Sequence, residues 1–189
     1  MFEEGVSLKA KYGEREVFDF SLGNPDLEPP AEFTARLREL ANSDALGTHG
    51  YMPNAGYPET RAAMARKVNR EHRIATTAEN IVMCVGAAAG LNVVMKTILD
   101  PGDEVLAIRP YFVEYGAYVG NHGGVLRVVD PAPDFGLSVE NIARALGPKT
   151  TAVIVNSPNN PTGRLYSETS IEALADVLRT YAQRTARRV

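Results

Sequence analysis

Short apolar runs alternate with helical segments from about residue 80 onward, and this alternation constrains the fold more than any other feature. The runs lie at 81–85, 105–108, 125–129 and 151–155, and a segment of helical character follows each of them. Runs of four or five mostly apolar residues are typical of strands that are buried on both faces. Because crossover helices join successive parallel strands, the pattern predicts βαβ units in a mostly parallel sheet.

The first part of the chain has a different sequence pattern. Residues 1–30 predict an irregular arm, which contains an apolar stretch at 17–22 and a turn-rich block at 23–30. The stretch 43–58 is rich in Gly, Asn and Pro and predicts a loop. Helical spacing of apolar side chains predicts the helices, which we expect at 31–42, 57–73, 91–99, 112–121, 139–146 and 168–181.

Composition excludes several classes of function. The chain has 189 residues, 44% of them hydrophobic, and a net charge of −3, which predicts neither a nucleic acid partner nor an anionic membrane partner. No segment approaches the roughly 20 apolar residues of a membrane span. The N-terminal residues have no signal-peptide pattern, so we expect a cytoplasmic protein.

Residues that bind metals are sparse. Cys84 is the only cysteine, which excludes a disulfide framework and a multi-cysteine metal site within the chain. Its place in the apolar run IVMCV predicts a buried structural thiol. His49, His72 and His122 are not at metal-ligand spacing to one another, and we expect no metal site.

The segment GAAAG (86–90) is the first of three that could bind a ligand. It follows a predicted strand and precedes a helix, which would present free backbone N–H groups and the positive end of the helix dipole to an anion. A plain strand-to-helix turn is the alternative. The segment is neither a P-loop nor a G-x-G-x-x-G pattern, which argues against a nucleotide-binding domain.

The other two segments follow later predicted strands. In RPYFVEYGAY, the side chains of Tyr111, Phe112 and Tyr115 could lay an aromatic face on a flat ring, although core packing is the simpler interpretation. In NSPNNPTGRLY, two prolines and a glycine restrain the backbone. That restraint favours Asn160 as a ligand-binding amide, with an ordinary turn as the alternative.

Five sequence blocks occur in an order and at a spacing that point to one family. They are SLGNPD, YMPNAGYPETR, VGAAAGLN with ILDPGDEV, PYFVEY and NSPNNPTG. In these blocks the chain resembles the class I/II aminotransferases of pyridoxal phosphate (PLP) fold type I, and most of all their aspartate and aromatic branch. The resemblance implies an α/β fold with three αβα layers and a mostly parallel sheet, incomplete here, behind an N-terminal arm.

The resemblance also implies a domain organisation and a function. Residues 1–45 would form the arm and part of a small domain, and residues 46–189 the N-terminal portion of the PLP-binding large domain. The implied reaction moves an amino group between an amino acid and a 2-oxo acid, with PLP as cofactor, in a homodimer with a shared active site. Two alternatives stay open: another PLP reaction, such as C–S lyase or decarboxylase chemistry, and a non-catalytic module that binds a phosphate ligand or a partner.

The matching positions receive roles from the resemblance. Gly86, Ala87 and Ala88 would hold the cofactor phosphate through their backbone N–H groups. Phe112 would stack on the pyridine ring, and Asn160 would hydrogen-bond the phenolic oxygen of the cofactor.

Two further roles fall on the N-terminal part of the chain. Tyr51 would reach the phosphate in the other subunit, unless its loop is merely solvated, and Gly23 would lie by the substrate carboxylate.

The family chemistry also needs a lysine that forms the Schiff base with PLP, an aspartate at the ring nitrogen and an arginine for the substrate carboxylate. In the family all three follow the region matched here. None of the lysines present lies in the family's lysine context; they are Lys9, Lys11, Lys67, Lys96 and Lys149. We therefore expect no catalytic residue within 1–189, which would be an inactive N-terminal part of a longer enzyme. With strand edges and apolar faces exposed, it would be poorly soluble or would associate.

Overall fold

The structure is a computed structural model that describes residues 2–19, 23, 25, 27–47, 49–186 and 189. Part of the predicted apolar stretch 17–22 and part of the block SLGNPD lie outside these residues. The chain divides into two compact units, Met1–Met52 and Pro53–Val189. We describe each unit by itself.

The first unit begins with a helix where the sequence predicted an irregular arm, so that prediction is wrong. Helix α1 spans Phe2–Tyr12, with acidic side chains in its first turn and basic ones in its last, as the helix dipole favours. Gly5 is buried against Asp19, since an added Cβ would lie 2.5 Å from a carboxylate oxygen of that residue. The Lys9 ammonium pairs with the same carboxylate at 3.3 Å.

The second helix of this unit, α2, spans Ala31–Ala41 and confirms the helix predicted at 31–42. The apolar side chains that share one of its faces, Phe33, Leu37 and Leu40, are each about half exposed. The amphipathic spacing therefore predicted the helix correctly, although the described contacts leave its apolar face open.

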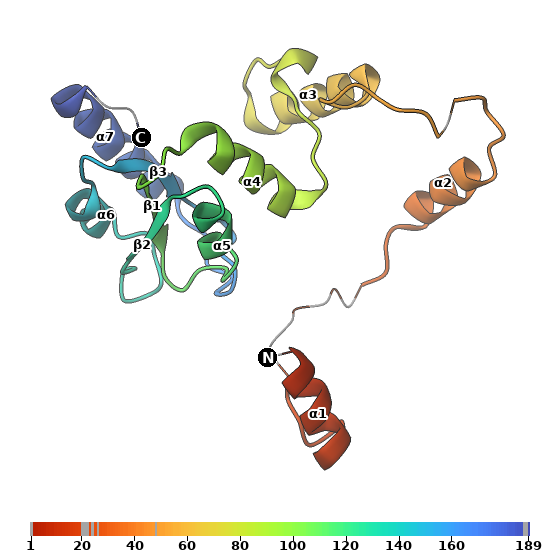
Figure 1. The fold of residues 1–189 in the computed structure, drawn as a ribbon, viewed down its shortest axis with the longest axis horizontal. Helices are drawn as coiled ribbons and strands as arrows, with labels where there is room; N and C mark the ends of the chain where they lie inside the picture. Colours follow the sequence, from red (N-terminus) through yellow and green to blue (C-terminus); the bar gives the residue numbers. More distant parts are fainter. Residues whose placement is uncertain (1, 20–22, 24, 26, 48, 187–188) are drawn as a thin grey trace. The chain divides into compact units, whose positions relative to one another are not determined.

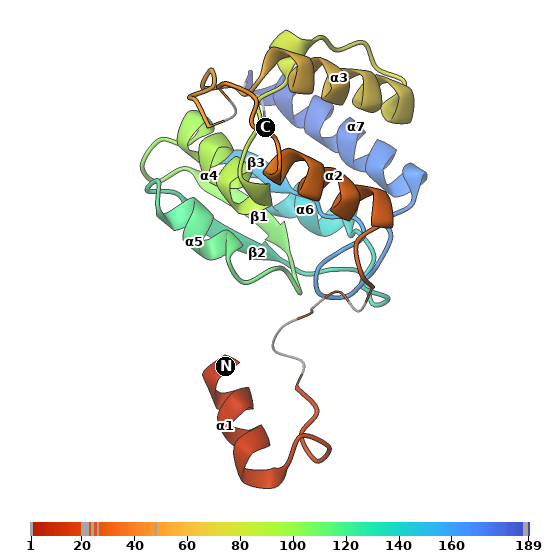
Figure 2. The same cartoon turned by 90° about the vertical axis from the view of Figure 1, so that its right-hand side faces the viewer.

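The second unit contains the predicted α/β elements (Figures 1 and 2). In chain order they are α3 (Pro58–His72), the short 3-10 helix η1 (Ala78–Asn80), α4 (Gly86–Ile98), β1 (Glu104–Ile108), α5 (Tyr115–Gly120), β2 (Val125–Val129), α6 (Val139–Ala145), β3 (Thr150–Ile154) and α7 (Glu168–Thr185). The sheet has the strand order β2-β1-β3, and both pairings are parallel. A parallel sheet with alternating helices was the central prediction, and it is confirmed.

Strand β1 lies at the centre of the sheet and explains why the unit has three layers. Val105 and Ala107 point to one face, where they pack in a cluster with residues of α4 and α5. Leu106 and Ile108 point to the other face and pack with residues of α6 and α7. Alternate side chains of a strand must face opposite ways, so a central strand that is apolar from Val105 to Ile108 needs helices on both sides.

The segment 81–85 does not form the strand that its apolar run predicted. Its backbone groups bond elsewhere: Met83 donates its N–H to the carbonyl of Ala55 at 3.0 Å, and Ile81 O accepts from the Arg61 side chain at 2.8 Å. Cys84, predicted to be buried, is exposed. An apolar run shows that a segment can be buried, but it does not show which neighbour it pairs with.

Candidate functional site

A cavity of about 380 Å³ lies where β1 and β3 end and α4 begins. Its lining comes from the segments that follow those two strands and from the first two turns of α4; the residues are Ala87, Ala88, Leu91, Phe112, Glu114, Tyr115, Tyr118, Asn156, Pro158 and Asn160. Because β1 and β3 are adjacent and parallel, their carboxyl ends lie at the same edge of the sheet. Ligands of open α/β sheets bind at that edge.

The N-terminus of α4 forms one wall of the cavity. The helix begins at Gly86, five residues earlier than predicted, so GAAAG is its first turn rather than a turn before it. No side chain caps this end, which leaves the first N–H groups of the helix without intrahelical partners. Gly86 has a φ of +74°, which strains any residue with a Cβ. Ala87 and Ala88 line the cavity with methyl groups only, so an anion can approach the backbone closely.

Aromatic side chains form a second wall, and their packing in the core is confirmed. Tyr115 is buried in the core beneath the cavity and also lines it. Phe112 is half-buried and meets Tyr115 edge to face, with ring centroids 5.9 Å apart and an interplanar angle of 80°. Tyr111 stacks on Tyr115 at 6.2 Å, but it does not line the cavity. Phe112 is therefore held by core packing while its ring remains available to a ligand.

The loop after β3 forms the third wall, and its own hydrogen bonds hold it. Asn159 is buried, its side-chain oxygen accepts from the Thr162 hydroxyl at 2.9 Å, and its carbonyl accepts from the N–H of Gly163 at 2.7 Å. The neighbouring Asn160 is exposed and lines the cavity, and its N–H donates to the Asn156 side chain at 2.8 Å. One asparagine thus holds the loop, and the other is presented to the cavity.

Two further lining residues, which the sequence did not indicate, form a hydrogen-bonded pair in this cavity. The Tyr118 hydroxyl donates a hydrogen bond to the Glu114 carboxylate, one helical turn away, and both side chains line the cavity. That hydrogen bond, together with burial and the nearby negative charge, raises the pKa of Tyr118 to about 12. The spacing of four residues could have indicated contact on a helix, but nothing in the sequence indicated which way the pair would point.

The remaining predicted site residues, Gly23 and Tyr51, belong to the first unit. Tyr51 is fully exposed, and an added Cβ on Gly23 would meet no described atom within 4 Å. Their roles stay predictions.

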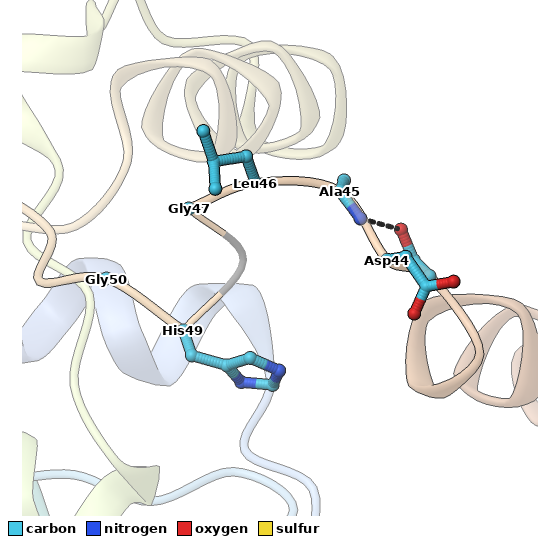
Figure 3. A pocket seen from close by; sticks show the side chains of 7 residues that line it. Asp44, Ala45, Leu46, Gly47, His49 and Gly50 are labelled. Atoms are coloured by element: carbon cyan, nitrogen blue, oxygen red, sulfur yellow. Dashed lines mark hydrogen bonds between the residues drawn. The ribbon is translucent and has the colours of Figure 1, made fainter.

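The first unit also has a hollow of about 450 Å³ in the loop that follows α2, lined by residues 43–47, 49 and 50 (Figure 3). A hydrogen bond of 3.3 Å from the Ala45 N–H to the Ser43 hydroxyl shapes the loop. The side chains of Leu46 and His49 point in different directions (Figure 3), and Leu46 is fully exposed.

Two other kinds of site are absent from the described residues. No group of three or more His, Cys, Asp or Glu side chains gathers there to hold a metal ion. None of the helices described has the length and apolar character that a membrane span requires.

Comparison with known proteins decides the family. The sequence matches the family described as aminotransferase class I and II over residues 15–184. The chain belongs to this family. An aspartate/prephenate aminotransferase of Thermus thermophilus is 41% identical over 175 residues, which cover 90% of this chain and 45% of that protein. An aspartate aminotransferase of Geobacillus stearothermophilus is 32% identical and is matched over 93% of this chain and 44% of its own length.

Solved aminotransferase structures share the fold. An aminotransferase from Eubacterium rectale matches with a TM-score of 0.92 at 35% identity, covering 99% of this chain and 48% of that chain. A mutant aspartate aminotransferase of Thermus thermophilus matches with a TM-score of 0.81 at 37% identity. The aminotransferase fold expected from the sequence is therefore confirmed. The chain spans about half the length of the curated aminotransferases that it matches.

Proposed function

We propose that this chain supplies the cofactor cradle of a PLP-dependent aminotransferase, which moves an amino group between an amino acid and a 2-oxo acid. One observation carries the proposal. Three separate segments contain residues predicted as cofactor ligands, and all three segments line the same cavity; the residues are Ala87, Ala88, Phe112 and Asn160. These segments lie far apart in the sequence, and the fold brings them together at one cavity.

The chemistry of the lining fits PLP part by part. The N-terminus of α4 offers N–H groups and a positive dipole end to a phosphate, with Gly86 setting the conformation. The Phe112 ring offers a face to a flat pyridine, and the amide of Asn160 offers a hydrogen bond to the phenolic oxygen. Bound PLP supplies an electron sink for the bonds at the substrate Cα.

We further propose that residues 1–189 alone bind PLP without forming a covalent bond and catalyse no transamination. No lysine is among the described residues that line the cavity, and the reaction needs an amine at the cofactor aldehyde. Borohydride reduction followed by peptide mapping tests this. We expect only scattered, substoichiometric labelling of surface lysines. One lysine labelled to a stoichiometry near one, and only when the ligand carries a phosphate, would show a covalent site in this chain.

The domain boundaries, the oligomeric state and the roles of Tyr51 and Gly23 are proposals as well. We assign residues 1–45 to the arm and part of a small domain, and residues 46–189 to the PLP-binding domain of a cytoplasmic homodimer. Tyr51, fully exposed on its loop, would reach the phosphate bound by the other subunit, and Gly23 would lie by the substrate carboxylate. The exposure of Tyr51 leaves its side chain free to contact a second subunit, as a shared active site requires.

Calorimetric titration of the chain with PLP tests the proposed function, and pyridoxal serves as the matched ligand without a phosphate. We expect PLP to bind at least about tenfold more tightly, because charge-assisted hydrogen bonds at the helix terminus contribute about 1.5–3 kcal/mol. Phe112→Ala should weaken binding of both ligands. Val113→Ala changes an adjacent side chain that is 70% exposed and does not line the cavity, so it should leave both affinities unchanged. Equal affinity for PLP and pyridoxal would contradict the proposal.

A further inference from the structure

The cavity contains a charge that the phosphate of PLP does not explain. Of the described residues that line it, Glu114 alone carries a carboxylate, and no lining residue carries a positive charge. A carboxylate beside a phosphate site weakens phosphate binding by repulsion. We therefore expect the Glu114 carboxylate to interact with a positive group elsewhere on the ligand.

The geometry fixes this carboxylate rather than leaving it free in solvent. The Tyr118 side chain is buried in the core with Met95 and Val119, and its hydroxyl donates to one oxygen of Glu114. The exposed Glu114 side chain, at the residue just before α5, is thus anchored by a buried partner on that helix. An ionised carboxylate has room for further donors after accepting one hydrogen bond.

The size of the cavity places any bound cation under the influence of this charge. A cavity of about 380 Å³ would be roughly 9 Å across as a sphere, close to the Debye length of about 8 Å at physiological ionic strength. An ammonium group on a ligand inside the cavity would therefore lie within about one Debye length of the Glu114 carboxylate, so that salt weakens their attraction only in part.

We propose that Glu114, oriented by Tyr118, is a binding group for an ammonium ion within the cavity, so that the site favours the aminated form of the cofactor, pyridoxamine 5′-phosphate, over the aldehyde form. The two forms share the ring and the phosphate, but only the aminated form carries an alkylammonium, which is protonated at pH 7 as a lysine side chain is. The inference rests on the proposed function, because it assumes that the cavity holds this cofactor. It makes Glu114 a specificity residue and Tyr118 a positioning residue.

The test compares dissociation constants of the 189-residue chain for pyridoxamine 5′-phosphate and for PLP. We expect the wild-type chain to prefer the aminated form, and Glu114→Gln to reduce this preference about five- to tenfold. Tyr118→Phe should reduce it by a smaller factor, and should have no further effect on the preference in the Glu114→Gln background, because it acts only through that carboxylate. Raised salt should reduce the preference in the wild-type chain more than in Glu114→Gln.

A matched variant controls for net charge. Glu172→Gln removes a carboxylate from an exposed position on α7 that does not line the cavity, and it should leave the preference unchanged. A preference that changes less than twofold in Glu114→Gln, while both ligands still bind, would overturn the role of Glu114 and leave the cofactor site standing. Failure of the wild-type chain to bind either ligand would overturn the cofactor site and the inference together.

Discussion

The hydroxyl of Tyr118 donates its hydrogen bond to the carboxylate of Glu114, four residues earlier in the chain, and both side chains line the candidate cofactor cavity. Neither residue was singled out by the sequence. The relationship gives the cavity a fixed negative group and makes the Tyr118 phenol a weaker acid than an ordinary tyrosine. Each consequence can be measured.

The first prediction concerns ionisation of Tyr118. Its pKa is raised from the usual value of 10 to about 12, first by the hydrogen bond to Glu114. Ultraviolet titration of the eight tyrosines, compared between wild type and Tyr118→Phe, should show that the lost phenol titrates near pH 12. In Glu114→Gln this phenol should titrate at lower pH. A difference spectrum that titrates near pH 10 in wild type would refute the hydrogen bond.

The same shift predicts how stability depends on pH. Between pH 10 and 12 the folded chain keeps the Tyr118 proton that the unfolded chain has lost, so the free energy of unfolding falls as pH rises through this window. The contribution is fully present below pH 10. Denaturant melts of wild type and Tyr118→Phe at pH 9, 10.5 and 11.5 should therefore converge as pH rises, and parallel curves would contradict the account.

Gly86→Ala should weaken both folding and anion binding. The φ of +74° at this position costs a residue with a Cβ about 1–2 kcal/mol, and relief of that strain would move the first turn of α4. We expect a lower free energy of unfolding and a several-fold loss of PLP affinity. Gly90→Ala is the control: Gly90 lies within α4, and its added Cβ would make only an ordinary contact at 3.9 Å. That variant should be more stable by about 0.5–1 kcal/mol.

The two adjacent asparagines should respond in opposite ways to alanine. Asn159→Ala removes a buried acceptor from the Thr162 hydroxyl and should cost about 1–3 kcal/mol of stability. Asn160→Ala alters an exposed side chain at the cavity, so its stability should change by less than about 0.5 kcal/mol while PLP affinity falls. Urea unfolding and ligand titration of both variants separate the roles. Equal stability losses would show that Asn160 also holds the loop.

Cys84 should react readily as a thiol, because it is exposed and not buried as its apolar neighbours suggested. Ellman's reagent should modify it in the folded chain at a rate close to that in denaturant. Since Cys84 lies just before the first turn of α4, PLP binding should slow the reaction. A thiol that reacts only after unfolding would support the burial predicted from the sequence instead.

Local patterns predicted most of the second unit. The central strand β1 and its neighbours were placed to within a residue or two, because mostly apolar runs flanked by turns are strong strand signals. The same rule failed at 81–85, where the run is equally apolar but its backbone bonds to Ala55 and Arg61. Pairing is a long-range property, and a short run carries no information about its partner.

The residues of the candidate site were likewise predicted only in part. Ala87, Ala88, Phe112 and Asn160 were found because family motifs mark them, and their gathering around one cavity follows from the parallel sheet. Glu114 and Tyr118 were missed because the direction in which α5 faces depends on its packing against α4. Helix α1 was missed because Gly5 and a polar sequence weaken its helical signal, whereas in the structure that glycine allows close contact with Asp19.

The central claim is that the cavity is a PLP site with the phosphate at the start of α4. Amide chemical-shift mapping of the ¹⁵N-labelled chain during a PLP titration tests it most directly. The account predicts that the largest shifts fall on the N–H groups of Ala87 and Ala88, that Phe112 and Asn160 shift with the same dissociation constant, and that pyridoxal leaves the two alanines nearly unmoved. Shifts that cluster elsewhere, or equal shifts at the alanines with pyridoxal, would contradict it.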